Sequence, residues 1–102
     1  MTEAACTNLE SHRAVALATS EHRAVYLDSR GLLELHQGRF QDAWNDFDAA
    51  VRAHPQDAHY RFGRGIAALR LGREAQGRSD LAAATALDPH IAETYAGHGI
   101  TP

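Results

Sequence analysis

The chain has 102 residues, a formal net charge of −3, 44% hydrophobic residues and 23% charged residues, which is typical of one folded domain with a modest core. Nucleic acid is not an expected partner, because the chain has no basic excess to collect phosphates. No stretch approaches the roughly 20 apolar residues of a membrane span, and the opening residues MTEAACTNLE lack the basic and apolar regions of an export signal. We therefore expect no membrane contact and a cytoplasmic location, with export of a longer parent protein as the open alternative.

The first part of the chain contains two segments in which apolar residues recur at helical spacing. Residues 7–19 have a loosely apolar side and predict a first helix. Ser20 is a suitable cap for a second helix over about 21–37, and Gly38 supplies a stop after it.

Three further helices are expected between residues 40 and 87. One covers about 40–54 and ends before Pro55, because proline disfavours the helical conformation in the residue that precedes it. The next covers about 58–71 and is stopped by Gly72, and the last covers about 74–87.

The sequence pattern of residues 31–55 is repeated in residues 65–89, at a constant offset along the chain. So many matches at one offset indicate an internal repeat, and the offset agrees with a known class of helix–turn–helix repeat whose period is about 34 residues. The tail begins a third copy, so a short helix over about 91–97 is expected to cover the open apolar side of the second hairpin. The matching pairs are Arg30/Arg64, Gly31/Gly65, Leu35/Leu69, Gly38/Gly72, Arg39/Arg73, Asp46/Asp80, Ala49/Ala83, Ala50/Ala84 and Pro55/Pro89.

These repeated residues resemble the tetratricopeptide repeat family. The small residue in the middle of that family's first helix matches Gly31 and Gly65, and the glycine that closes the helix matches Gly38 and Gly72. The resemblance covers about residues 24–91 and implies an all-α fold of about six helices, a short right-handed α-solenoid of antiparallel helix hairpins. The small, large apolar, alanine and proline positions of the family's second helix are matched by Ala43 and Gly77, Phe47 and Leu81, Ala50 and Ala84, and Pro55 and Pro89.

By this resemblance, residues 1–102 form a single domain. Its parts are an N-terminal capping helix at 7–19, repeat one at 21–55, repeat two at 56–89 and a C-terminal capping helix at 90–98. Gly77 departs from the usual alanine, and glycine within a helix costs about 1 kcal/mol relative to alanine. We therefore expect the second hairpin to be the weaker one.

The pairs of charged residues that recur have a structural interpretation. Arg30 and Asp46 are separated by the same length of chain as Arg64 and Asp80, and each pair spans the two helices of one hairpin. The sequence predicts a salt bridge inside each hairpin, with display of the arginines to an acidic ligand as the alternative.

The sequence gives little support for catalysis or for a metal centre. No two of the seven histidines are three or four residues apart, the separations that put two ligands on one side of a helix. The acidic cluster Asp42, Asp46 and Asp48 is interpreted as a solvated helix surface, since general acid–base catalysis needs a sheltered pair. We expect no catalytic residue, no metal and no cofactor.

In the tetratricopeptide family, the first helices of successive repeats line a concave groove that binds peptides or helices. An apolar strip with polar rims suits an amphipathic helix, which makes the expected function non-catalytic protein binding. One subset of the family clamps a C-terminal carboxylate with lysine and asparagine, but those positions here hold Asp28 and Leu32. The groove positions implied by the resemblance are Val25, Asp28, Leu32, Leu35, His36, His59, Phe62, Ile66, Leu69 and Arg70.

Two alternatives to this groove stay open at this point. The capping helices could cover part of the strip. The chain could also associate with itself, as a homodimer or as a terminal assembly domain, because two repeats are fewer than the roughly three usually needed to bury a continuous solenoid core. The partner itself, a protein or peptide, is not identified by the sequence.

Overall fold

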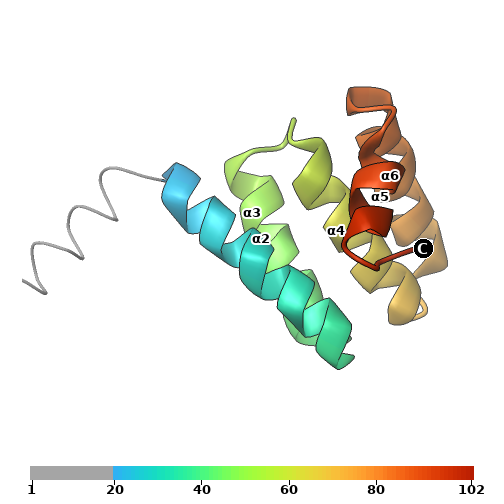
Figure 1. Cartoon of the computed structure of the whole chain (residues 1–102), viewed down its shortest axis with the longest axis horizontal. Helices are drawn as coiled ribbons and strands as arrows, with labels where there is room; N and C mark the ends of the chain where they lie inside the picture. The colour runs from blue at the N-terminus through green and yellow to red at the C-terminus, as the bar shows by residue number, and fades with distance from the viewer. Residues whose placement is uncertain (1–19) are drawn as a thin grey trace, which may run out of the picture.

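A computed structural model of the chain describes residues 20–102, which form five α-helices and no strand (Figure 1). The all-helical class is confirmed, and the bounds agree with the expected ones to within a residue at each end. The helix expected at residues 7–19 lies outside the described residues. The helices are α2 (Ser20–Gln37), α3 (Phe40–Ala53), α4 (Ala58–Arg70), α5 (Glu74–Leu87) and α6 (Ile91–Gly97).

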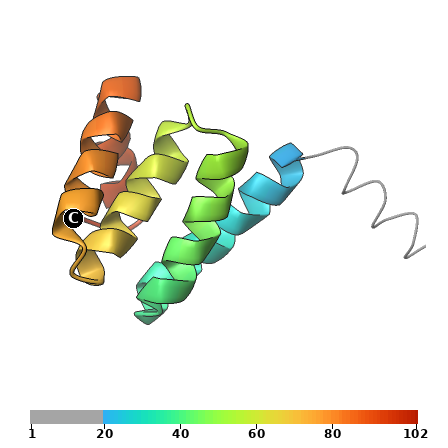
Figure 2. The same ribbon diagram turned by 180° about the vertical axis from the view of Figure 1, so that it is seen from behind.

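Consecutive helices pack side by side, so that α2 and α3 form one hairpin and α4 and α5 form the next. Figure 2 shows α3 and α4 adjacent in the middle of the array, which joins the two hairpins into one layered stack. The short α6 packs on both α4 and α5. It therefore lies at the opposite end of the stack from α2 (Figure 1).

Glycine ends three of the helices in the same way. Gly38, Gly72 and Gly99 have φ angles of 76°, 81° and 78°, in the left-handed region that costs glycine least. After each of them, the next backbone N–H donates back across the helix end, for example from Ile100 to the Tyr95 carbonyl at 3.0 Å. The turn that ends α2 and α4 thus also ends α6, although α6 is much shorter than either of them.

The larger core lies between the hairpins and contains the fully buried Phe47. A Cβ atom on Gly31 would lie 2.7 Å from the Phe47 ring, and one on Gly63 would lie 2.4 Å from it. The ring therefore fills space that only glycine leaves free on α2 and on α4. A smaller cluster, containing Ala50 and Tyr60, continues the packing of α3 against α4.

The second hairpin is packed by close approach of two backbones. A Cβ on Gly65 would lie 2.9 Å from the Gly77 carbonyl oxygen, and a Cβ on Gly77 would lie 2.7 Å from Cγ of Leu69. Gly77 is therefore required by packing, and its low helix propensity does not by itself make the second hairpin the weaker one.

Candidate protein-binding surface

Each hairpin contains the predicted arginine–aspartate bridge. The Arg30 guanidinium donates through Nε and Nη2 to the two Asp46 carboxylate oxygens, both at 2.7 Å. Arg64 makes the same paired bonds to Asp80, at 2.7 and 2.8 Å. Both aspartates are buried, so the interpretation of Asp42, Asp46 and Asp48 as one solvated helix surface is wrong for Asp46, which faces Arg30 inside the hairpin. The structural interpretation of these charges is confirmed, and the bridges use charge-assisted bidentate geometry, which is stronger than a single neutral bond.

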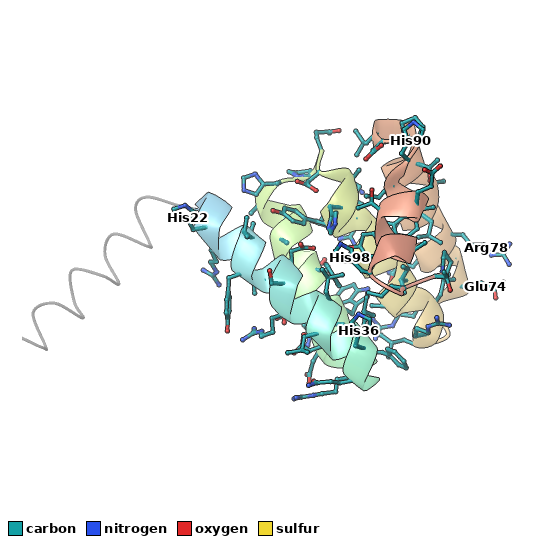
Figure 3. All side chains as sticks on the ribbon, viewed as in Figure 1. His22, His36, Glu74, Arg78, His90 and His98 are labelled. Atoms are coloured by element: carbon teal, nitrogen blue, oxygen red, sulfur yellow. The ribbon has the colours of Figure 1, made fainter. Side chains whose placement is uncertain are left out.

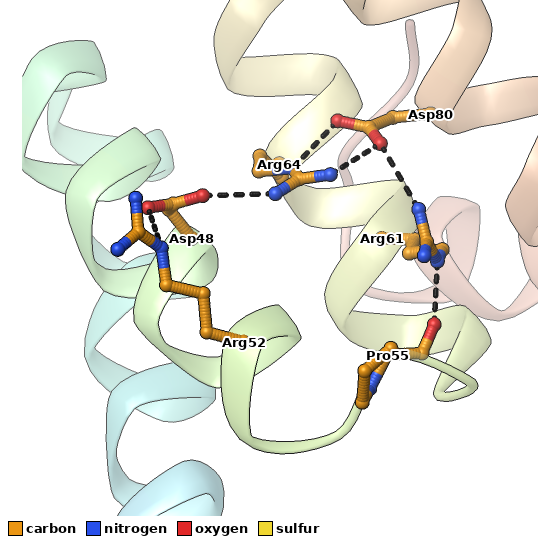
Figure 4. A network of polar contacts seen from close by, with 6 residues as sticks. All are labelled: Asp48, Arg52, Pro55, Arg61, Arg64 and Asp80. Carbon is orange, nitrogen blue, oxygen red and sulfur yellow. Dashed lines mark hydrogen bonds and ion pairs between the residues drawn. The ribbon is translucent and has the colours of Figure 1, made fainter.

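Arg64 also connects the two hairpins, as Figure 4 shows. Its Nη1 donates to Asp48 of α3 at 2.8 Å. Asp48 is held from its other side by Arg52 at 3.0 Å, and Asp80 is approached by Arg61 at 3.6 Å. The network therefore runs from α3 through α4 to α5.

A carboxyl pair sits beside the bridge of the first hairpin. Glu34 is buried, and burial together with its hydrogen bond to Asp46 raises the pKa of Glu34 to about 7. Burial opposes ionisation of Asp46 as well, but the bonds from Arg30 and Glu34 outweigh it and hold the pKa of Asp46 below its usual value. Ala68 takes the place of Glu34 in the second hairpin.

The ten groove positions expected from the sequence are not one open strip. Leu35, Phe62 and Ile66 are in the larger core. Leu32 and Leu69 are half-buried, with Leu69 lying against α5. Asp28 and His59 are also half-buried, so only Val25, His36 and Arg70 remain exposed.

The helix α6 covers part of the expected groove strip. The Tyr95 ring lies against Phe62, with ring centroids 4.8 Å apart, and against His59, with centroids 4.7 Å apart. The Tyr95 hydroxyl donates to the His59 carbonyl oxygen at 2.6 Å. Burial raises the pKa of Tyr95, so the hydroxyl keeps its proton for this bond. One of the open alternatives, that a capping helix covers part of the strip, therefore agrees with the described structure.

The pair formed by Asp28 and His59 ties α2 to this cluster. The Asp28 carboxylate lies 3.0 Å from Nδ1 of His59, and this hydrogen bond raises the pKa of the imidazole. The charged imidazole is thus favoured next to the carboxylate. These two polar groove positions are paired with each other across two helices.

The residues after α6 close the other end of the strip. Ile100 is buried in the larger core, and the Thr101 carbonyl oxygen accepts a bond from Nη2 of Arg70 at 2.9 Å. A pocket of about 250 Å³ remains between α2, α4 and this segment. His36, one of its lining residues, is labelled in Figure 3. Its lining is Leu35, His36, Phe40, Ile66, Arg70, Gly99, Ile100 and Thr101.

Sequence reasoning predicted the capping helix at 91–97 and left open that it covers part of the strip, but it did not assign the side chains of Tyr95 and Ile100 to that cover. One signal was available, because Gly99 and Ile100 stand one repeat period after Gly65 and Ile66. In α4 the equivalent glycine lies inside the helix, whereas Gly99 ends the backbone bonding of α6. The offset alone does not distinguish these two uses of glycine.

Residues 20–102 contain no group of three histidine, cysteine, aspartate or glutamate side chains placed to hold a metal ion. None of the helices in this range is long and apolar enough to cross a bilayer. The surface around the pocket presents the imidazole of His36 and the guanidinium of Arg70 beside apolar residues. Such groups can bind the side chains and carboxylates of a partner.

A comparison with family profiles matches residues 29–90 to the tetratricopeptide repeat. The match spans more than half of the chain and contains both hairpins' glycine and arginine pairs. Comparisons with curated proteins and with solved structures gave no match.

Proposed function

Because the chain belongs to the tetratricopeptide repeat family, whose repeats generally mediate protein–protein interaction without catalysis, we propose that it is a non-catalytic module that binds a peptide or an amphipathic helix on its concave face. The contact is made at the pocket between α2, α4 and the C-terminal segment. The buried residues Leu35, Phe62 and Ile66 support this surface from beneath.

The single observation that carries this proposal is the composition of the pocket. Its accessible lining is mostly polar, with His36 and Arg70 exposed at the rim, while the buried side chains of Leu35 and Ile66 line it from beneath. A partner side chain can be buried there while its own backbone or a carboxylate bonds to the rim. Exposed polar groups around a concave site can fix the orientation of a bound peptide by hydrogen bonds and ion pairs.

A peptide-display selection on the whole chain tests the proposal. Selected peptides are measured by fluorescence anisotropy against His36→Glu and Arg70→Glu. The matched controls are His90→Glu and Arg78→Glu, which change exposed residues of the same types away from the pocket (Figure 3). We expect each pocket variant to lose about tenfold in affinity, which is about 1.4 kcal/mol, with the controls unchanged. Peptides that bind all four variants equally would contradict the proposal.

Self-association is the second candidate function, and one observation favours it. The helix α2 exposes Val25, Tyr26 and Leu33 at 55%, 58% and 55% of their surfaces, and clustered exposed apolar residues often become interfaces. Light scattering coupled to size-exclusion chromatography distinguishes the two functions. A dimer at micromolar concentration that Leu33→Asp dissociates would support self-association, and a monomer at all concentrations would exclude it.

A further inference from the structure

The outer surface of α2 corresponds to a surface of α4 that is an internal interface. Tyr26 and Leu33 stand one repeat period before Tyr60 and Ala67. In α4, Tyr60 is 8% exposed and Ala67 is fully buried, because α3 packs over them. In α2 the equivalent residues are more than half exposed, since α2 lies at the end of the described array (Figure 1). We call Tyr26, Arg30 and Leu33 the α2 end face.

Within the described part of the chain, Arg30, at the centre of the α2 end face, lacks the second carboxylate that its counterpart Arg64 has in Asp48. Nη1 of Arg64 donates to Asp48 at 2.8 Å. The equivalent Nη1 of Arg30 donates to the Tyr26 hydroxyl at 3.4 Å, and the guanidinium lies 5.2 Å from the centroid of the same ring. Among residues 20–102, no carboxylate other than Asp46 pairs with Arg30. The Arg30 side chain is 46% exposed, against 19% for Arg64. The geometry leaves one guanidinium edge directed at the open face.

We propose that the α2 end face is a second docking surface, which takes an amphipathic helix of another protein carrying an aspartate or glutamate opposite Arg30. The docked helix occupies the place on α2 that α3 occupies on α4. Its apolar residues cover Tyr26 and Leu33, and its carboxylate bonds to Nη1 of Arg30 as Asp48 bonds to Nη1 of Arg64. This surface lies outside the pocket proposed above.

One residue narrows the kind of helix that fits. In α4, Gly63 accepts the Phe47 ring so closely that a Cβ there would lie 2.4 Å from it. The equivalent residue of α2 is Ser29. An aromatic ring therefore does not fit at that place, and the docked helix carries a small residue one position before its carboxylate.

The charge of Arg30 disfavours a second copy of this chain as the occupant. Arg30 lies between Tyr26 and Leu33 along α2. Two α2 end faces related by a two-fold axis would place the two Arg30 side chains against each other, and like charges in contact are repulsive. Neither copy would supply the missing carboxylate from this face.

The chain's own N-terminal segment does not match the α3 template either. Ala14 stands one repeat period before Asp48, so the segment carries no carboxylate in that register. The turn that lets α3 lead into α4 covers residues 54–57, whereas the equivalent residues 20–23 already belong to α2.

A peptide built on the α3 template tests the proposal. The peptide reproduces residues 40–53 with Phe47→Ala, is stapled to hold its helix and carries a fluorophore. A control peptide adds Asp48→Asn. Full-length protein variants Leu33→Asp and Leu87→Asp make the same change at exposed leucines on α2 and on α5, and circular dichroism checks that both fold.

We expect the peptide to bind and to change the NMR chemical shifts of the Tyr26 and Leu33 amides. Asp48→Asn in the peptide and Leu33→Asp in the protein should each lower the binding affinity about five- to tenfold, as is typical when a charge pair or an apolar contact is lost. Leu87→Asp should leave the affinity unchanged. The proposal is overturned if the peptide does not bind, if its amide shifts fall elsewhere, or if Asp48→Asn has no effect.

Two further measurements separate the other occupants. In the full chain, Leu9→Asp combined with Leu17→Asp should leave peptide affinity unchanged, and a gain would mean that the N-terminal segment competes for the face. Light scattering should show a monomer at high micromolar concentration. A dimer that the peptide dissociates would mean that a second copy occupies the face.

Discussion

The hairpin of α2 and α3 is closed by an aromatic ring, whereas the hairpin of α4 and α5 is closed by two glycines. Phe47 fills the first, and the backbones at Gly65 and Gly77 meet in the second. Both hairpins keep the same arginine–aspartate bridge. One repeat skeleton is thus held by different packing in its two copies, so the same substitution should have a different cost in each.

The largest expected difference is at the main apolar residue of each hairpin. Phe47→Ala should lower the free energy of unfolding by about 3–5 kcal/mol, because it empties a fully buried site that spans three helices. Leu81→Ala should cost about 2 kcal/mol, since Leu81 is only partly buried. Urea unfolding followed by circular dichroism measures both. Equal losses would break the distinction between the two hairpins.

The small residues Gly77 and Ala43 occupy equivalent places in the two hairpins. Gly77→Ala gains about 1 kcal/mol of helix propensity, but its Cβ meets Leu69 and the Gly65 carbonyl, and such overpacking costs about 1–3 kcal/mol. We expect a net loss. Ala43→Gly in the first hairpin should lose about 1 kcal/mol of helix propensity, and it should lose packing energy as well because the Ala43 methyl is fully buried in the larger core. Thermal unfolding that shows Gly77→Ala to be more stable than the parent chain would mean that the two backbones are not in contact.

The buried carboxyl of the first hairpin should make stability depend on pH. Since the folded-state pKa of Glu34 is raised to about 7 from 4.5, its contribution is fully present below about pH 4.5 and is lost as pH rises through 7. Glu34→Gln should remove this loss, so the variant should gain roughly 1–2 kcal/mol relative to the parent between pH 5 and pH 8.

Urea unfolding at the two pH values measures the effect, with Glu74→Gln as the control, because Glu74 is exposed on α5. The effect should be absent in that control. A parent chain and a Glu34→Gln variant with parallel pH profiles would contradict the assigned environment of Glu34.

The smallest expected change in the free energy of unfolding is at the ion pair of Arg64 and Asp48, which links the two hairpins. Asp48→Asn removes the charge that Arg64 and Arg52 share, and should cost about 0.5–1 kcal/mol because the pair is only partly buried. The control Asp42→Asn breaks the exposed pair with Arg39 and should change little. Double-mutant cycles with Arg64→Gln give the coupling energy, and a value of zero would remove the link.

Much of this fold could be predicted because its signals are local or repeated. Gly38 and Pro55 end helices by backbone geometry, which is readable from single residues. The salt bridges could be predicted because one arginine–aspartate separation occurs twice in the sequence. The requirement for Gly77 could not be predicted, because it depends on how closely α5 approaches the Gly65 backbone, which propensity does not describe.

The candidate surface was harder to predict for the same kind of reason. Phe62 and Ile66 have the positions of groove residues in the repeat pattern. Whether such residues face a ligand or the core depends on what the chain does after them. Here Gly99 ends α6 early, and Ile100 turns back onto Ile66 and its neighbours. Whether Phe62 and Ile66 are covered therefore depends on one backbone conformation near the C-terminus, that of Gly99.

Amide hydrogen exchange at Tyr95 and Ile100 tests most directly whether α6 and the C-terminal segment cover the concave strip. The Ile100 N–H is bonded to the Tyr95 carbonyl, and both side chains are buried. We predict protection of the Ile100 amide comparable to that of amides in α4, because opening its bond to the Tyr95 carbonyl would pull the buried Ile100 side chain out of the larger core. Exchange at the rate of an unstructured peptide, with α4 still protected, would contradict the account and make Leu35, Phe62 and Ile66 an open apolar groove.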